Sequence, residues 1–156
     1  PREHTLNLSD KVYGSRSIAA IGVAAHECGH AIQHARHYVP LTVRSAIIPA
    51  ANIGSSFAWP LVLIGLIIPR LNFCMTIGIL LFSLVVILQL VTLPVEFNAS
   101  RRAIQIIRDS GYLAPDELKG AKSVLKAAAM TYVAAMVSVS LQLLRLVILR
   151  NSRDDN

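Results

Sequence analysis

The chain has 156 residues, of which 54% are hydrophobic and 15% charged, and it carries a formal net charge of +6 at pH 7. Because an ordinary soluble domain has about 25% charged residues, this composition argues against a soluble protein and favours one that lies in a lipid bilayer. The sequence has no glycine-aromatic RNA motif and no basic helix with interleaved aromatic residues, so we expect no nucleic-acid partner. We expect the cations to flank membrane spans instead.

The first part of the chain predicts a polar segment followed by a helix. Residues 1–16 are mostly polar, and the alternation from Thr5 to Leu8 predicts a short edge strand. Ser17 is a suitable helix cap. No proline occurs from Ile18 to about His37, so we predict one helix over these residues, ended by Pro40.

Three long apolar runs follow, and a helix needs about 20 such residues to cross a hydrocarbon core of about 30 Å. The first, residues 47–69, carries Asn52, Gly54 and Pro60, so we expect its first half to be irregular or packed against protein. The second is predicted to run from residue 73 to a stop near Pro94 and to be followed by a polar helix over residues 95–108. A loop at residues 110–112 precedes the third run, residues 124–149.

These elements predict a mainly α fold: an integral membrane protein with about three transmembrane helices plus the helix that carries the histidines. We expect residues 1–156 to form a single domain. Pro1 is not an initiator methionine and no signal sequence follows it, so we expect an N-terminally truncated or processed chain. Cys28 and Cys74 are expected at opposite ends of a span, which predicts that they form no disulfide.

The predicted N-terminal helix contains the motif His26-Glu27-Cys28-Gly29-His30. It matches the H-E-x-x-H pattern, in which histidines at positions i and i+4 lie on one helix face and bind zinc. Four residues of helix advance about 6 Å, so both rings can reach one ion. Glu27 then lies beside the water on that ion without binding the ion itself, so it is placed to take the proton of that water.

The motif could also arise by chance, or belong to a buried histidine-glutamate cluster that serves only the structure. By chance alone, the H-E-x-x-H pattern is expected in a few of about a thousand chains of this composition. A buried ionisable cluster among small apolar residues is costly unless a metal or charge compensates it. His34 lies about 12 Å along the helix from His26, too far for both to join one ion with His30. We therefore expect His34 and His37 to lie on the solvated end of the helix or to contact substrate.

A catalytic zinc ion usually has three protein ligands and one open position, so a third ligand is needed. Glu96 is the candidate, because the first span leads away from the motif, a tight turn at residues 69–72 reverses the chain, and the second span returns just before Glu96. The sequence gap of 66 residues from His30 to Glu96 is thus expected to close in space. Glu96 can also stabilise the first helical turn after Pro94.

Several motifs together resemble the YugP-type membrane zinc metallopeptidases of bacteria. They are HECGHAIQHA, the PLxxRSAxxPxANIGS pattern from Pro40 to Ser55, LVTLPVEFNASRRA and MTYVAAM. The resemblance covers nearly the whole chain. It implies a zinc-dependent peptidase in the membrane, with His26 and His30 as ligands and Glu27 as the catalytic acid and base. Family members usually carry a further N-terminal transmembrane helix, which agrees with a truncated start at Pro1.

The chain is also similar to gluzincins of the CAAX-prenyl-protease and HtpX type, whose third ligand is the Glu of an E-[FY]-x-A-D pattern. This chain reads Glu96-Phe97-Asn98-Ala99-Ser100. Ser100 therefore replaces an Asp that orients a zinc-bound histidine. A hydroxyl accepts the same imidazole hydrogen bond but has no charge, so its support for the ligand is expected to be weaker.

The function predicted from these residues is zinc-dependent endopeptidase activity with one Zn²⁺ per chain held by His26, His30 and Glu96. Glu27 is expected to deprotonate the zinc-activated water and later to protonate the leaving amine. Peptides or membrane proteins are the expected substrates. Weak candidates for stabilising the oxyanion are Arg101, Arg102 and Tyr132.

The alternative function is a non-catalytic membrane scaffold in which zinc joins the histidine helix to the Glu96 segment. Structural zinc normally has four protein ligands, whereas only three are identified, so the hydrolase is favoured. A transporter is a third possibility, suggested by Asn52 and Gln89 within the spans, but no charged pair is expected at mid-depth.

The distribution of cations predicts how the protein is oriented in a bacterial plasma membrane. Eight cations fall on the side of the motif and four on the other; the eight are Arg36, Arg44, Arg101, Arg102, Arg108, Lys119, Lys122 and Lys126, and the four are Arg70, Arg145, Arg150 and Arg153. Because cytoplasmic loops are enriched in Lys and Arg, we expect a multi-pass protein whose active site faces the cytoplasm.

Overall fold

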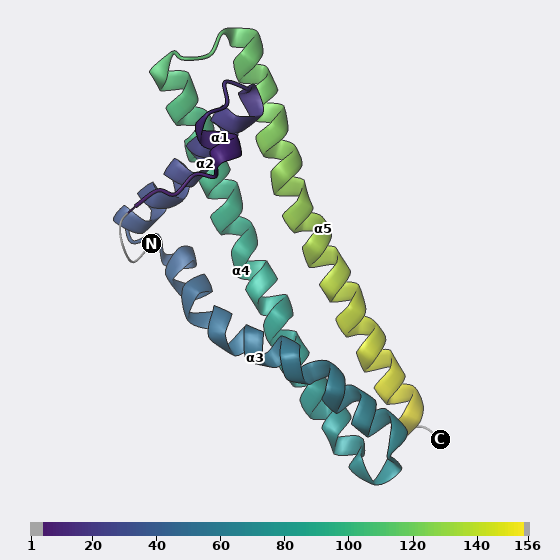
Figure 1. Cartoon of the computed structure of the whole chain (residues 1–156). Coiled ribbons are helices and arrows are strands. Elements are labelled where there is room, and N and C mark those ends of the chain that lie inside the picture. Colours follow the sequence, from purple (N-terminus) through teal and green to yellow (C-terminus); the bar gives the residue numbers. More distant parts are fainter. Residues whose placement is uncertain (1–4, 155–156) are drawn as a thin grey trace. The chain divides into compact units, whose positions relative to one another are not determined.

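The computed structural model describes residues 5–154 and contains only helices and connections in that range. Its elements are α1 (Asp10–Tyr13), α2 (Ile18–Ala35), α3 (Val39–Ile67), the short 3-10 helix η1 (Pro69–Leu71), α4 (Asn72–Ser110) and α5 (Pro115–Asp154), as Figure 1 shows. The predicted mainly α fold is confirmed. The edge strand predicted at Thr5–Leu8 is wrong, because these residues are irregular.

Three helices are long and apolar enough to cross a membrane, which confirms the expected number. They cover Val39–Ile67, Pro69–Ser110 and Pro115–Arg153. Large apolar side chains remain exposed along all three, among them Phe57, Leu63, Leu80, Leu90, Leu141 and Leu144. Lipid is the solvent that such surfaces require.

The prolines interrupt the helices less than the sequence suggested. Pro94 lies inside α4, so the predicted stop there is wrong, and Pro49 and Pro60 lie inside α3. Membrane helices tolerate internal proline because neighbouring groups satisfy the freed backbone. Beyond Pro94, α4 is also stabilised by its packing, since Val95, Ala99 and Ala103 are each 0% exposed.

The first half of the first span was expected to be either irregular or packed against protein. It is helical and packed against protein. Ala51, Gly54 and Ala58 are buried in α3. A Cβ atom added to Gly54 would lie 2.6 Å from the carbonyl oxygen of Leu81 in α4. Small residues thus bring these two helix backbones together, as is common in membrane proteins.

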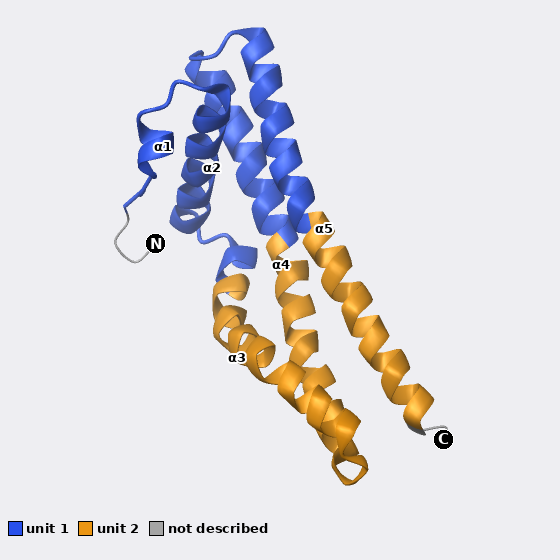
Figure 2. Ribbon diagram, turned by 45° about the vertical axis from the view of Figure 1, so that its right-hand side comes forward, with its two compact units in different colours: residues 1–42, 93–132 blue, residues 43–92, 133–156 orange. Residues whose placement is uncertain are grey.

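The chain forms two compact units, which Figure 2 shows in blue and orange. Unit 1 comprises residues 1–42 and 93–132, and unit 2 comprises residues 43–92 and 133–156. The core of unit 1 joins α2, α4 and α5 through Ala25, Ala103, Ile107, Ala121 and Leu125. The core of unit 2 joins α3, α4 and α5 through Ala58, Val62, Met75, Ile79, Phe82, Val86 and Leu146.

The histidine helix α2 has well-defined ends. The Ser17 side chain accepts a hydrogen bond from the backbone N–H of Ala20, as predicted for a cap. At the other end, the N–H of His37 bonds to the carbonyl of His34 and the N–H of Tyr38 to that of Gln33, the pair of bonds that defines a Schellman motif. His37 occupies the left-handed position with φ of 49°. The helix therefore ends at Ala35, two residues before the predicted end, and Pro40 lies in the first turn of α3 instead.

Both cysteines, Cys28 and Cys74, are free thiols, as the sequence predicted.

Candidate metal centre

His26 and His30 project from the same face of α2, one helical turn apart. Their ring centroids lie 4.7 Å apart and their planes are nearly perpendicular, at 89°. The two Nε2 atoms are separated by 3.1 Å. The spacing of the motif thus brings two imidazole nitrogens to one point, as the sequence predicted.

Helix α4 approaches α2 closely at Gly29, which lies between the two histidines. A Cβ atom on Gly29 would lie 2.5 Å from the carbonyl oxygen of Ala99 and 3.1 Å from its Cα. Ala99 itself is fully buried. Because Glu96 and Ser100 lie within one turn of Ala99, this backbone contact sets how near they come to the histidine rings.

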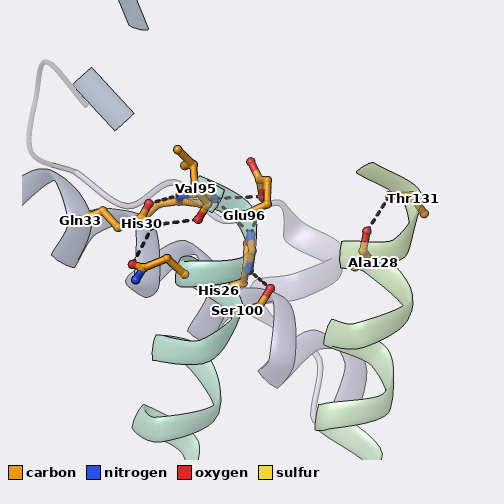
Figure 3. Close-up of polar contacts among 9 residues, drawn as sticks. His26, His30, Gln33, Val95, Glu96, Ser100, Ala128 and Thr131 are labelled. Atoms are coloured by element: carbon orange, nitrogen blue, oxygen red, sulfur yellow. Dashed lines mark hydrogen bonds and ion pairs between the residues drawn. The ribbon is translucent and has the colours of Figure 1, made fainter. Parts of the chain in front are cut away.

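Glu96 reaches the histidine pair from α4. Its Oε2 atom lies 3.1 Å from Nε2 of His26 and 3.5 Å from Nε2 of His30, and the residue is only 2% exposed. The three donor atoms all lie within 4.8 Å of one another (Figure 3). The sequence gap between Glu96 and the motif therefore closes in space as expected.

The three donors fit a tetrahedral zinc ion. Donor atoms about 2.0–2.1 Å from zinc at tetrahedral angles lie about 3.3 Å from one another. The observed separations of 3.1, 3.1 and 3.5 Å are close to this value. Two imidazole nitrogens and one carboxylate oxygen also form the ligand set of a common class of catalytic zinc sites.

Hydrogen bonds from neighbouring side chains orient both rings. Nδ1 of His30 lies 2.9 Å from Oε1 of Gln33, an acceptor, so this nitrogen carries the ring proton. Nδ1 of His26 lies 3.2 Å from the Ser100 hydroxyl, which accepts the hydrogen bond when Nδ1 carries the ring proton. With Nδ1 protonated, the Nε2 lone pair of each ring points at the common centre. Ser100 thus lies beside the His26 ring, at the position from which it was expected to orient a zinc-bound histidine.

Gln33 belongs to the site although no sequence pattern singled it out. It is 0% exposed, and its Nε2 donates to the Val95 carbonyl at 2.8 Å and to Oδ1 of Asn98 at 3.0 Å. The same Oδ1 atom accepts from Nε of Arg102 at 2.8 Å. Gln33 therefore fastens His30 to α4. Its position three residues after His30, on the same helix face, was a signal that could have identified it.

The environment of His30 favours a cation. Burial lowers the pKa of this ring, but hydrogen bonds with Glu96 and Gln33 and the charges of Glu96 and Glu27 raise it, and its pKa lies above the ordinary value of 6.5. Without a metal, the His30 ring therefore holds a proton more readily than a free imidazole does. A metal ion is the cation that takes the place of such a proton.

The other predicted residues lie around this group. Glu27 is exposed on α2, is not one of the three converging donors, and is close enough for its charge to raise the pKa of His30. His34 and His37 are exposed at the end of α2 and lie outside the group. Of the oxyanion candidates, Arg101 is exposed, Arg102 bonds to Asn98, and Tyr132 lines a pocket beside His26.

Replacing Gly29 with Ala is expected to disrupt this centre. The added methyl group overlaps the Ala99 backbone, so α2 and α4 must separate and the histidines must move away from Glu96. Overpacking of this kind costs about 1–3 kcal/mol of stability. We expect zinc affinity, measured by competition with a chromogenic chelator, to fall at least tenfold.

Gly22→Ala is the matched control for Gly29→Ala. It lies buried on the same helix, but a Cβ atom there would meet only Cγ of Leu125, at 3.9 Å. This variant is expected to bind zinc normally and to gain stability from the better helix propensity of Ala. Equal zinc affinity in the two variants would contradict the role given to the contact at Gly29.

Comparison with known proteins identifies the family. A family described as "Putative neutral zinc metallopeptidase" matches residues 1–151. The chain is 48% identical over 157 residues to the "Putative membrane protease YugP" of Bacillus subtilis (strain 168), with 100% of this chain and 69% of that relative covered. No solved structure matches the chain significantly. The chain therefore belongs to the family described as "Putative neutral zinc metallopeptidase", which confirms the resemblance seen in its motifs and implies zinc as its cofactor.

Proposed function

We propose that the chain is a membrane endopeptidase that hydrolyses peptide bonds of peptide or membrane-protein substrates. In this proposal His26, His30 and Glu96 hold one zinc ion per chain, and Glu27 is the catalytic acid and base. The observation that supports it most is the convergence of two imidazole nitrogens and one buried carboxylate oxygen within 4.8 Å, with an exposed Glu beside them.

In this reaction the zinc ion, the general base and the side chains that orient the ligands have separate roles. Zinc, when bound, polarises the peptide carbonyl and lowers the pKa of water to about 7. Glu27 accepts the proton of the attacking water and then transfers it to the leaving amine, as a general base and acid. Gln33 and Ser100 hold the two imidazole rings with Nε2 directed inward.

The donor set favours the hydrolase over a zinc-stabilised scaffold. A structural zinc site is usually closed by four protein ligands, whereas a catalytic site leaves one position open. Within residues 5–154 the converging group contains three donors, and the nearby Cys28 is not among them. A scaffold also has no use for an exposed carboxylate next to the first ligand. These points support an enzyme.

The proposed site faces the cytoplasm of a bacterial cell, on the basis of the excess of Lys and Arg on the side of the motif. Labelling of an Arg70→Cys variant in which Cys28 and Cys74 are replaced by Ala tests this orientation. We expect a membrane-impermeant thiol reagent added to intact cells to label position 70. Labelling only after the cells are opened would contradict the proposed orientation.

The hydrogen-bond network around His30 predicts that Gln33→Leu weakens zinc binding. The substitution removes the acceptor of the His30 proton and both bonds to α4. Loss of such a partner typically costs about 10–100-fold in metal affinity or activity. Competition titration with a chelator measures the change; an unaltered affinity would show that Gln33 does not orient the ring.

The test of the proposed function is hydrolysis by the purified chain in lipid nanodiscs. Zinc-loaded protein is incubated with a mixture of internally quenched peptides, and the cleavage sites are read by mass spectrometry. We expect cleavage that a zinc chelator stops and that added Zn²⁺ restores. Absence of cleavage by the zinc-loaded protein, or cleavage unaffected by the chelator, would contradict the proposal.

A further inference from the structure

A small apolar pocket adjoins the candidate metal centre within unit 1. It has a volume of about 120 Å³ and is bounded by α2, α4 and α5; the residues that matter here are Val23, His26, Ser100, Val124, Ala128 and Tyr132. One wall of the pocket is therefore formed by the ring of His26, a proposed metal ligand. The adjacent wall includes the Ser100 hydroxyl, which lies 3.2 Å from Nδ1 of that ring.

The lining of the pocket favours an apolar occupant. Apart from His26, Ser100 and Tyr132, every lining residue is Val, Leu or Ala, and no Asp, Glu, Lys or Arg lines it. Ser100 is engaged with Nδ1 of His26. No Asp, Glu, Lys or Arg in the lining compensates a charged side chain for the hydration that it would lose there, so a charged occupant is unfavourable.

The size of the pocket limits the occupant further. An apolar cavity of about 150 Å³ is known to hold one benzene molecule. A pocket of about 120 Å³ thus has room for a branched aliphatic side chain such as that of Val or Leu, and the larger indole of Trp is expected to fit it less well.

We propose that this pocket is a specificity site that receives a branched aliphatic side chain flanking the scissile peptide bond. The inference rests on the proposed function, because the pocket can contact a substrate side chain only if a peptide is cleaved at the metal centre beside His26. Because His26 both lines the pocket and directs its Nε2 atom at the metal centre, a peptide whose carbonyl lies at that centre is expected to place a neighbouring side chain against this wall. The substrate class is then peptide segments rich in Val and Leu, such as those of membrane proteins.

Ala128 is the best position at which to test the pocket. It lies on α5, where its carbonyl accepts a hydrogen bond from the Thr131 hydroxyl (Figure 3), and its side chain lines the pocket. Ala128→Leu adds three carbons to the wall of the pocket. The preceding residue, Ala127, is exposed on the same helix turn and does not line the pocket, so Ala127→Leu is the matched control.

The experiment uses zinc-loaded protein in nanodiscs and internally quenched peptides that differ only in the residue flanking the cleaved bond. The residue is Gly, Val, Leu, Asp or Trp, and kcat/KM is measured for each. The native chain is expected to prefer Leu over Gly, Asp and Trp by at least tenfold, since one methylene group more or less in an apolar pocket changes kcat/KM by about 10–200-fold. In Ala128→Leu the ratio of Leu to Gly should fall at least tenfold, and in Ala127→Leu it should stay at the native value.

Val124→Ala, which enlarges the pocket, gives an independent readout if Ala128→Leu does not fold. It should raise kcat/KM for the Trp peptide relative to the Leu peptide. Zinc content confirms that each variant is folded. If native protein cleaves all peptides equally, or if neither variant changes the ratios, the pocket inference is overturned while the proposed function stands. If native zinc-loaded protein cleaves none, the proposed function fails and the inference fails with it.

Discussion

Replacing Glu27 with Gln is expected to lower the rate of peptide hydrolysis by a factor of about 10² to 10⁴ while one zinc ion per chain stays bound. The amide has nearly the same shape as the carboxylate but cannot accept a proton from water. Glu27 is not one of the converging donors, so its loss leaves the ligands in place. Zinc content by atomic absorption and kcat on a quenched peptide are measured on the same preparation.

Glu117→Gln is the control for this experiment. Glu117 lies at the start of α5, where its side chain accepts a hydrogen bond from the Ala114 N–H. An amide oxygen accepts the same bond, so this variant should keep both zinc and activity. Full activity in Glu27→Gln would end the assignment of Glu27 as the base, and loss of zinc would show that it acts as a ligand.

The second large effect is expected from Glu96→Gln, which should lose both zinc and activity. The substitution keeps the size of the buried side chain, so the packing around it is retained, but it replaces a charged oxygen ligand with a neutral amide. Two imidazoles alone bind zinc weakly compared with the three-ligand set of catalytic sites. We expect zinc content after dialysis to fall well below one ion per chain.

Glu96→Ala removes both the carboxylate and the volume of the side chain, and this variant should lose zinc to the same extent as Glu96→Gln. The residue is 2% exposed, so this variant also leaves a cavity and should unfold at a lower temperature than Glu96→Gln. If Glu96→Gln keeps one tightly bound zinc ion, the carboxylate is not a ligand and the proposed centre is wrong.

The sequence predicted best those features that depend on spacing along one helix. The separation of four residues between His26 and His30 is enough to place both rings on one face, whatever surrounds the helix. Likewise, the lengths of the apolar runs sufficed to predict three membrane spans. The approach of Glu96 was predicted from the order of the spans, and the structure brings its oxygen to 3.1 Å from His26, although its role as a ligand stays a prediction.

Features that depend on contacts between helices were not predictable in this way. The importance of Gly29 lies in a backbone contact with Ala99, which no local pattern in α2 reveals. The spacing of three residues from His30 indicates that Gln33 lies near that ring, but its burial against Val95 and Asn98 of α4 follows only from the packed pair of helices. Pro94 was expected to end a helix by a rule drawn from soluble proteins, and tertiary packing overrode that rule.

X-ray absorption at the zinc edge of the purified chain tests most directly whether these three side chains hold the metal. We expect two histidine nitrogens at about 2.0–2.1 Å from zinc, oxygen ligands at about 2.0–2.2 Å, and loss of this spectrum in Glu96→Gln. A sulfur ligand at about 2.3 Å, as Cys28 would give, or an unchanged spectrum in Glu96→Gln, would contradict this expectation.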